Sequence, residues 1–512
     1  MITQNKFIIE TSEYYPIDLL KSKIGLNNND EVKCIFKELN IYSIKSGIEN
    51  KKMYELLDNS DIVTNFGTDS KIEYRETPND LYYSNQYYMD LISAPETWNY
   101  NTGGLSYDGD TIVVAVLDKG IEISHPDLID NMWKNRFEIP GDNIDNDNNG
   151  YVDDYDGLDL RNDDGNIYSA AHGTGVSGII GASGNNSRGI SGVNWNVKIL
   201  PITSIGLKSD LIQAYNYIID FRDKYNKTNG AEGAFIVCSN LSAGFSGEFV
   251  TDGTNLIFCN IYDKLGEVGI LNVSAADNIG ENMDEVGDIP TLCPSDYLIP
   301  VTSVDANDDY DVYRGYSNIS VDIAAPGEDI YTTTVDDSYT YSSGNSEAAP
   351  MVAGAIALFY TVPCSGFIEK VKLNPSELSL NIKDYMMEYS DKHSDLTERT
   401  VSGGRLNINA TYAKLSDFCG EIEYGKLEII KITPNPATDN IEVYYNFAKT
   451  DKHNISIFNT SGQLIYTKDF YPNIFGDKIL DIDISYFPKA TYYAKLTDGE
   501  NNVSKAFVAF RK

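Results

Sequence analysis

Residues 111–118 read TIVVAVLD, an apolar strand pattern that ends in an acidic residue. A strand without polar residues on either face is typical of a parallel sheet that helices cover on both sides. The same pattern recurs further along the chain, at VKILPIT (197–203), AFIVCSNLS (234–242), GILNVSAA (269–276) and YLIPVTSV (297–304). These runs predict the central sheet of the protein.

Helix-like segments lie between several of these strands, for example GTGVSGIIGA (173–182) and DLIQAYNYIIDF (210–221). Alternation of strands and helices predicts an α/β fold, with a mostly parallel sheet and helices on both faces. In such folds the functional residues gather at the carboxyl ends of the strands. The alternating block ends near Ala413.

Two further units flank this block. Residues 1–75 combine strand-like KCIFKELNIYSIK (33–45) with helix-like NKKMYELLDN (50–59), which predicts a small α+β domain. The last part of the chain has short alternating runs separated by Asn, Gly, Pro and Asp, the pattern of an antiparallel β-sandwich. We therefore expect separate domains, which cover residues 1–75, 76–420 and 421–512.

The composition narrows the possible function classes. The 512 residues carry a formal net charge of −36, which argues against a nucleic-acid partner, although solubility alone also explains this charge. No apolar run approaches the ~20 residues that a membrane-spanning helix needs. The segment MITQNKFIIETSEYYP (1–16) lacks the apolar core of a secretory signal, and we expect that such a signal was removed.

The chain has six cysteines, and none of them shows the CxxC spacing of zinc or thioredoxin-type sites. Cys259 could be bridged to Cys293, and Cys364 to Cys419. The alternative is a set of buried thiols, and the sequence does not assign the pairing.

Three side chains stand where an α/β sheet presents functional groups. Asp118 follows the apolar strand, His172 opens a glycine-patterned helix, and Ser346 lies in GNSEAAPMVAG (344–354) at the start of an alanine-rich helix. The N-terminus of that helix offers free N–H groups and a partial positive charge where an oxyanion could form. Taken singly, each of the three residues could equally be a turn, core or N-cap residue.

Taken together in this order, LDKGIEISHPDL (117–128), HGTGVSGIIGA (172–182) and GNSEAAPMVAG (344–354) resemble the catalytic signatures of subtilisin-like serine proteases. The resemblance covers roughly residues 80–413. It implies a serine endopeptidase that hydrolyses protein or peptide substrates through an acyl-enzyme.

The resemblance also implies a role for each site residue. The Ser346 hydroxyl would attack the scissile carbonyl, His172 would take its proton, and Asp118 would orient His172. Asn278, in AADNIG, would donate a hydrogen bond to the oxyanion. The segment NLSAGFSGE (240–248) resembles the part of the family that pairs with an extended substrate, which would involve Ser242, Ala243 and Gly244.

Several residues depart from the family pattern. Asn345 and Glu347 stand where the family usually has the Thr and Met of GTSMA, Asp277 replaces a glycine, and Lys119 replaces a small residue. Lys119 could pair with Asp118 and disturb the triad. The alternative function is therefore a catalytically impaired, subtilisin-fold binding or adhesin-like protein.

The segment IDNDNNGYVDDYDG (144–157) is rich in oxygen ligands. Asp145, Asp147 and Asn149 alternate before a glycine, and Asp153 follows. Oxygen donors in this pattern suit a hard cation, so we expect a structural Ca²⁺ site at these four residues. A solvated acidic turn is the alternative.

Both ends of the chain resemble parts of secreted proteases. Residues 1–75 resemble a propeptide that would inhibit its own enzyme, with KIEYRETPND (71–80) reaching the cleft. The tail, from ITPNPATDNIEVYY (432–445) to the final strand, resembles the C-terminal sorting domain of type IX secretion substrates. We therefore expect a secreted or cell-surface protein that meets the type IX machinery. A generic β-sandwich, or an intracellular protease with a degenerate tail, is the alternative.

Overall fold

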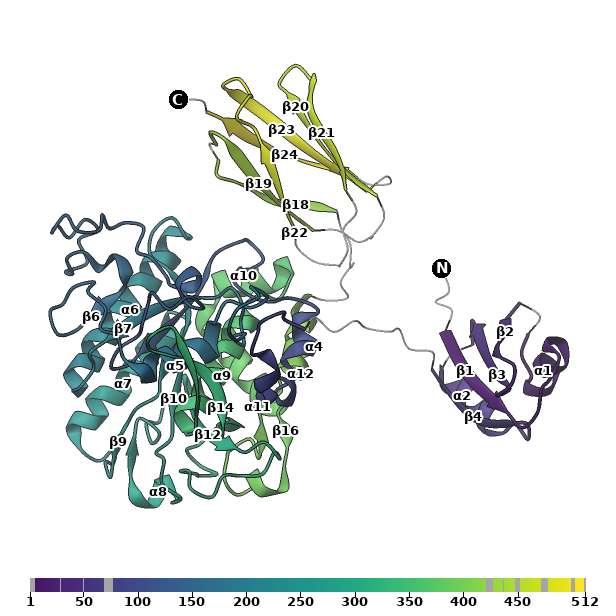
Figure 1. Cartoon of the computed structure of the whole chain (residues 1–512), viewed down its shortest axis with the longest axis horizontal. Coiled ribbons are helices and arrows are strands. Elements are labelled where there is room, and N and C mark those ends of the chain that lie inside the picture. The colour runs from purple at the N-terminus through teal and green to yellow at the C-terminus, as the bar shows by residue number, and fades with distance from the viewer. Residues whose placement is uncertain are drawn as a thin grey trace. The chain divides into compact units, whose positions relative to one another are not determined.

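The computed structural model describes residues 5–27, 29–48, 50–68, 77–419, 427–435, 437–446, 452–470, 478–498 and 502–510 (Figure 1). The chain divides into one compact unit of residues 1–74 and another of residues 75–512. The predicted domain boundaries after residues 75 and 420 fall outside the described residues, as does most of KIEYRETPND (71–80).

The first unit is a four-stranded antiparallel sheet in the order β2-β3-β1-β4, with two helices between its strands. Its core includes Phe7, Ile9, Tyr42 and Met53, each fully buried. The prediction of a small mixed domain agrees with this architecture. Its elements are β1 (Asn5–Thr11), α1 (Ile17–Ile24), β2 (Glu31–Phe36), β3 (Ile41–Ser46), α2 (Asn50–Asp58) and β4 (Val63–Thr68).

The second unit contains a nine-stranded sheet in the order β16-β17-β13-β12-β10-β8-β5-β7-β6. Its ladders are parallel except between β16 and β17, so the predicted α/β class is confirmed. The strands are β5 (Ile112–Leu117), β6 (Leu158–Asp159), β7 (Lys198–Thr203), β8 (Phe235–Leu241), β10 (Leu271–Ala275), β12 (Leu298–Val304), β13 (Ile323–Pro326), β16 (Asp391–Lys392) and β17 (Gly404–Arg405).

Strand β5 shows why the sheet is covered on both faces. Its residues are all buried, and they alternate between two cores: Val114 and Val116 join one, and Val113 and Leu117 join the other. The first core includes α5 (Ala171–Gly181) and α9 (Asn345–Phe359), and the second includes α6 (Lys208–Thr228) and α7 (Gly253–Glu267). Both faces are therefore apolar, as the unbroken pattern at residues 112–117 predicts.

The remaining elements of this domain surround the sheet (Figure 1). Two short ladders, β9 with β11 and β14 with β15, lie outside the main sheet. The elements are α3 (Tyr87–Leu91), α4 (Ala94–Trp98), β9 (Phe245–Ser246), α8 (Met283–Val286), β11 (Asp288–Ile289), β14 (Ile330–Thr334), β15 (Ser338–Ser342), α10 (Ser365–Leu373), α11 (Pro375–Glu388) and α12 (Ile408–Leu415). No helix in the described part of the chain is long and apolar enough to cross a lipid bilayer.

Two disulfides join the cysteines that sequence reasoning offered as partners. Cys259 in α7 is bonded to Cys293, and Cys364 before α10 is bonded to Cys419. Cys238 is a free thiol in the core, and its burial raises its pKa. Disulfides of this kind persist in oxidising compartments, as expected for an exported protein.

The C-terminal residues form two antiparallel sheets, in the orders β18-β19-β22 and β21-β20-β23-β24. Both sheets contribute to one apolar core, which contains Ile441 and Val443 from the first and Ile457 and Leu496 from the second. The predicted β-sandwich is confirmed. Its strands are β18 (Glu428–Thr433), β19 (Asn440–Asn446), β20 (His453–Asn459), β21 (Leu464–Phe470), β22 (Lys478–Asp483), β23 (Ala490–Thr497) and β24 (Asn502–Ala509).

Candidate active site

Asp118 and His172 meet at the carboxyl end of β5. Asp118 directly follows that strand, His172 lies in the first turn of α5, and His172 Nδ1 is 2.7 Å from Asp118 Oδ2. Gly173 makes this approach possible, because a Cβ there would lie 2.3 Å from the Gly120 carbonyl oxygen and 2.8 Å from Asp118 Cβ. A larger residue at position 173 would push the helix away from the strand.

The charges around His172 raise its pKa above the ordinary value. The hydrogen bond to Asp118 is the main cause, and the negative charges of Asp118 and Glu347 add to it. Burial and the positive charge of Lys119 oppose this rise. The imidazole is therefore a stronger base than a free histidine, as a group that must accept a proton requires.

Glu347 and Lys119, which depart from the family pattern, occupy different environments. Glu347 is 6% exposed, and its Oε1 accepts a hydrogen bond from the Ser342 hydroxyl at 2.6 Å. Burial raises the pKa of Glu347. Lys119 is exposed and donates its backbone N–H to Asp118 Oδ1 at 2.7 Å. Among the described residues, its ammonium forms no ion pair with Asp118.

We expect Glu347→Gln to lower the pKa of His172, because the substitution removes a negative charge that favours the imidazolium. Lys119→Gln is the matched control and should raise it, because a positive charge is removed. The chain has only four histidines, so NMR titration of the ring Cε1–Hε1 signals can follow His172 directly. A shift in the same direction for both variants would contradict this account of the site.

Ser346 lies at the N-terminus of α9, where Gly344 precedes the helix in an extended conformation. The Ser346 side chain is mostly buried, and its hydroxyl donates to the Ser242 carbonyl oxygen at 3.4 Å, a long and weak hydrogen bond. The described residues include no hydrogen bond between Ser346 and His172. Such contacts often tighten only when substrate binds, so the relay through Ser346 stays a prediction.

Asn278 is held beside the start of α9. Its Oδ1 accepts a hydrogen bond from the Asn345 backbone N–H at 2.9 Å, and its Nδ2 makes no hydrogen bond with any described residue. The Asn345 amide is used differently, since it donates to the carbonyl oxygens of Ala276 and Asp277 at 3.0 and 3.2 Å. Asn345 thus fixes the loop that carries Asn278. The predicted role of Asn278 as an oxyanion donor requires a free side-chain amide, and its Nδ2 meets that requirement among the described residues.

A pocket of about 100 Å³ opens beside these residues. Its lining includes the predicted substrate-binding residues Ser242, Ala243 and Gly244, together with Asn278 and Ser346. The structure therefore brings the predicted substrate-pairing segment, the predicted oxyanion donor and the predicted nucleophile to one cavity. The same cavity contains an aspartate that sequence reasoning missed, Asp288.

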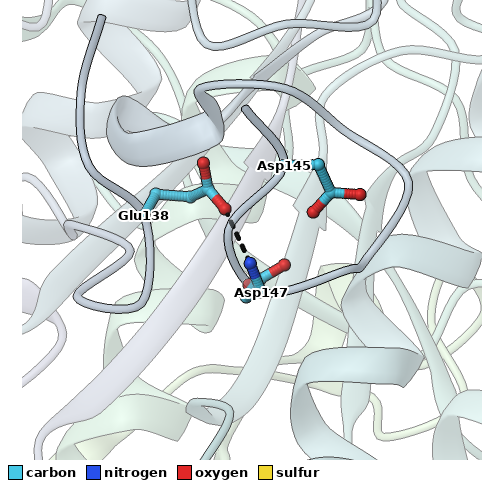
Figure 2. A group of neighbouring side chains, drawn as sticks. All are labelled: Glu138, Asp145 and Asp147. Atoms are coloured by element: carbon cyan, nitrogen blue, oxygen red, sulfur yellow. Dashed lines mark hydrogen bonds between the residues drawn. The ribbon is translucent and has the colours of Figure 1, made fainter. Parts of the chain in front are cut away.

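The acidic loop brings two of the four predicted calcium ligands together with a third acid. Asp145 and Asp147 lie near Glu138, with one oxygen of each within 4.8 Å of the others (Figure 2). Asp153 instead accepts hydrogen bonds from the backbone N–H groups of residues 141–143. Asn149 Nδ2 donates a hydrogen bond to Asp154, which is outside the group. Glu138 lies before the motif, where no local pattern marks it.

Comparisons with known proteins identify the family of this domain. Residues 109–399, more than half of the chain, match the family described as the Subtilase family. The chain belongs to the subtilase family. The resemblance inferred from the three signatures is thereby confirmed. Residues 431–509 match the secretion system C-terminal sorting domain.

Several named proteases are similar to this subtilase. Subtilisin-like protease 1 of Plasmodium berghei (strain Anka) is 29% identical over 371 residues, which cover 68% of this chain and 56% of that protein. The thermophilic serine proteinase of Bacillus sp. (strain AK1) is 31% identical over 339 residues, 65% of this chain and 70% of that one. Thermitase of Thermoactinomyces vulgaris is 28% identical over 290 residues, 55% of this chain and 85% of that one. The chain spans about half the length of its Plasmodium relatives or less.

Proposed function

We propose that this subtilase is a secreted serine endopeptidase that uses Asp118, His172 and Ser346 as its triad. The observation that supports this most is the 2.7 Å contact of His172 with Asp118, beside a pocket that Ser346 and Asn278 both line. The raised pKa of His172 fits a general base. The family match supports the same chemistry.

The positions of these residues fit a separate role for each of them in the reaction. The Ser346 hydroxyl oxygen attacks the carbonyl carbon of the substrate, and its proton passes to His172 Nε2. Asn278 Nδ2 and the N–H groups at the start of α9 stabilise the negative oxygen. The C–N bond then breaks as His172 returns the proton to the leaving amine, and water repeats the sequence to release the acid.

Labelling with a fluorophosphonate probe tests the proposal. After residues 1–75 are removed, the purified protein should be labelled covalently and should hydrolyse casein, and Ser346→Ala should lose both properties. Ser343→Ala is the matched control, because it removes an exposed hydroxyl three residues away and should keep both. A folded protein that neither labels nor hydrolyses after residues 1–75 are removed would favour the alternative of a binding or adhesin-like protein.

We also propose that Glu138, Asp145 and Asp147 hold a structural Ca²⁺. Glu138 is 4% exposed, and its Oε2 is buried without a hydrogen-bond partner among the described residues. Its Oε1 accepts hydrogen bonds from the backbone N–H of Asn146 at 2.7 Å and from that of Asp147 at 3.0 Å, which fixes the carboxylate. Figure 2 shows the bond from Asp147. A buried carboxylate oxygen that lacks a donor is costly, and a bound cation would remove this cost; carboxylate oxygens suit Ca²⁺.

Calcium removal should therefore destabilise the protein. If Ca²⁺ is present at 100 times its Kd, chelation is expected to lower the free energy of unfolding by about 2.7 kcal/mol. Asp147→Asn should make the melting temperature insensitive to Ca²⁺, while Asp309→Asn, an exposed control, should keep the full response. Calorimetry in Ca²⁺ and in EDTA measures both, and an equal Ca²⁺ response in the two variants would contradict the assignment.

We further propose a role for each of the two domains that flank the protease domain. Residues 1–75 would act as a propeptide that inhibits the enzyme, and residues 421–512 would direct export to the medium or the cell surface through the type IX machinery. The sorting-domain match supports the second role. Fusion of residues 421–512 to a reporter in a type IX-competent cell tests it, because the reporter should then appear outside the cell.

A further inference from the structure

The pocket beside Ser346 has a buried carboxylate in its wall. Asp288 belongs to β11, which pairs with β9, and its side chain is 1% exposed. Asp288 Oδ2 accepts hydrogen bonds from the Asp277 backbone N–H at 3.0 Å and from the Thr291 hydroxyl at 2.7 Å. Asp288 Oδ1 accepts no hydrogen bond from the residues that the structure describes. One oxygen is thus fixed, and the other is available to a ligand.

Gly244 places this available oxygen at the cavity. A Cβ at Gly244 would lie 3.0 Å from Asp288 Oδ1 and 2.9 Å from the Ile289 carbonyl oxygen, so any side chain there would cover the carboxylate. Because Gly244 lines the pocket, its lack of a side chain leaves Asp288 Oδ1 open to the cavity.

The pocket has no positive charge to balance this acid. Of the described residues that line it, none is lysine, arginine or histidine, and Asp277 is a second acid, with Oδ2 buried and unpartnered. Burial and the charge of Asp277 raise the pKa of Asp288 to about 6, so that Asp288 is ionised above neutral pH. An ionised buried carboxylate without a cationic partner is costly, and a cation from outside the chain would remove that cost.

We propose that this pocket binds the side chain of lysine or arginine at the substrate residue whose carbonyl is attacked, with Asp288 as its ionic partner. The inference rests on the proposed function, because Ser346 and Asn278 would hold that carbonyl at the mouth of the same pocket. The aliphatic stem would lie against Ala275 and Ala276, which also line it. The substrate class is therefore proteins cleaved after basic residues.

A set of fluorogenic peptides that differ only at this residue tests the inference. Lysine should be cleaved with a kcat/KM about 10- to 100-fold above that of norleucine, which has a similar stem without the charge. Asp288→Asn should reduce this ratio to near one while the norleucine peptide is still cleaved. The ratio is measured within one preparation at pH 8, so differences in folded fraction cancel.

Glu285→Gln is the matched control. It removes the same charge from an exposed position three residues away, and it should keep the preference for lysine. A loss of preference in this control would assign the effect to the overall negative charge, and would overturn the role of Asp288. A wild-type preference for norleucine would overturn the inference alone, because hydrolysis still occurs. Failure to cleave any peptide, without fluorophosphonate labelling, would overturn the proposed function and this inference with it.

Discussion

Ser346→Ala is expected to lower kcat for peptide hydrolysis by about 10⁶-fold, the scale known for the catalytic serine of a subtilisin. The substitution removes the oxygen that attacks the substrate carbonyl in the proposed mechanism, so that no acyl-enzyme can form. His172→Ala should cost about as much, because the serine is a weak nucleophile unless a base accepts its proton. Preparations matched by the concentration of folded protein and a long assay with a fluorogenic peptide measure both losses.

The double variant distinguishes a catalytic relay from two separate effects. Residues that act as one unit are strongly non-additive, so Ser346→Ala combined with His172→Ala should be no slower than either single variant. The residual rate would then come from substrate binding and from the oxyanion donors. Losses that multiply in the double variant would contradict the relay, and the absence of loss in Ser346→Ala would assign the nucleophile elsewhere.

The sequence was sufficient to predict those parts of the site that depend on the sheet topology. Asp118 ends an apolar strand and His172 begins a small-residue helix, and a parallel sheet brings such positions to one edge. The glycine at position 173 is visible in the sequence, and the structure shows that it permits the close contact of α5 with Asp118. The small residue that can be read in the sequence at position 173 is thus also the one that the contact between α5 and Asp118 requires.

Two acids could not be predicted as ligand-binding residues from the sequence, because only long-range packing brings them to their sites. Asp288 is an ordinary residue in VGDIP, and only the pairing of β11 with β9 buries it beside Gly244. Glu138 precedes the acidic motif, and its carboxylate meets Asp145 and Asp147 only because the loop folds back on it. By contrast, the carboxylate of Asp153 is used locally, by backbone N–H groups of residues 141–143.

Asp118→Asn is expected to lower kcat by about 10⁴-fold while leaving the fold intact. The carboxylate accepts a hydrogen bond from His172 Nδ1–H and so leaves Nε2 without a proton, ready to accept one from Ser346. An asparagine amide can instead donate to Nδ1, which puts the proton of the neutral ring on Nε2. The ring would then face the serine with a donor and could not act as its base.

The pH profile separates this loss of orientation from a change in basicity. Activity needs neutral His172, so in the wild type kcat/KM rises as the pH passes through the raised pKa of that residue. Asp118→Asn removes the hydrogen bond and the charge that raise this pKa, while burial still lowers it, so the acid limb should move to lower pH. The variant would thus have more neutral imidazole at pH 6 than the wild type and still be far slower. Lys119→Gln, which keeps the carboxylate, should preserve the plateau and move the limb to higher pH. A plateau within tenfold of wild type in Asp118→Asn would show that orientation by Asp118 is not needed.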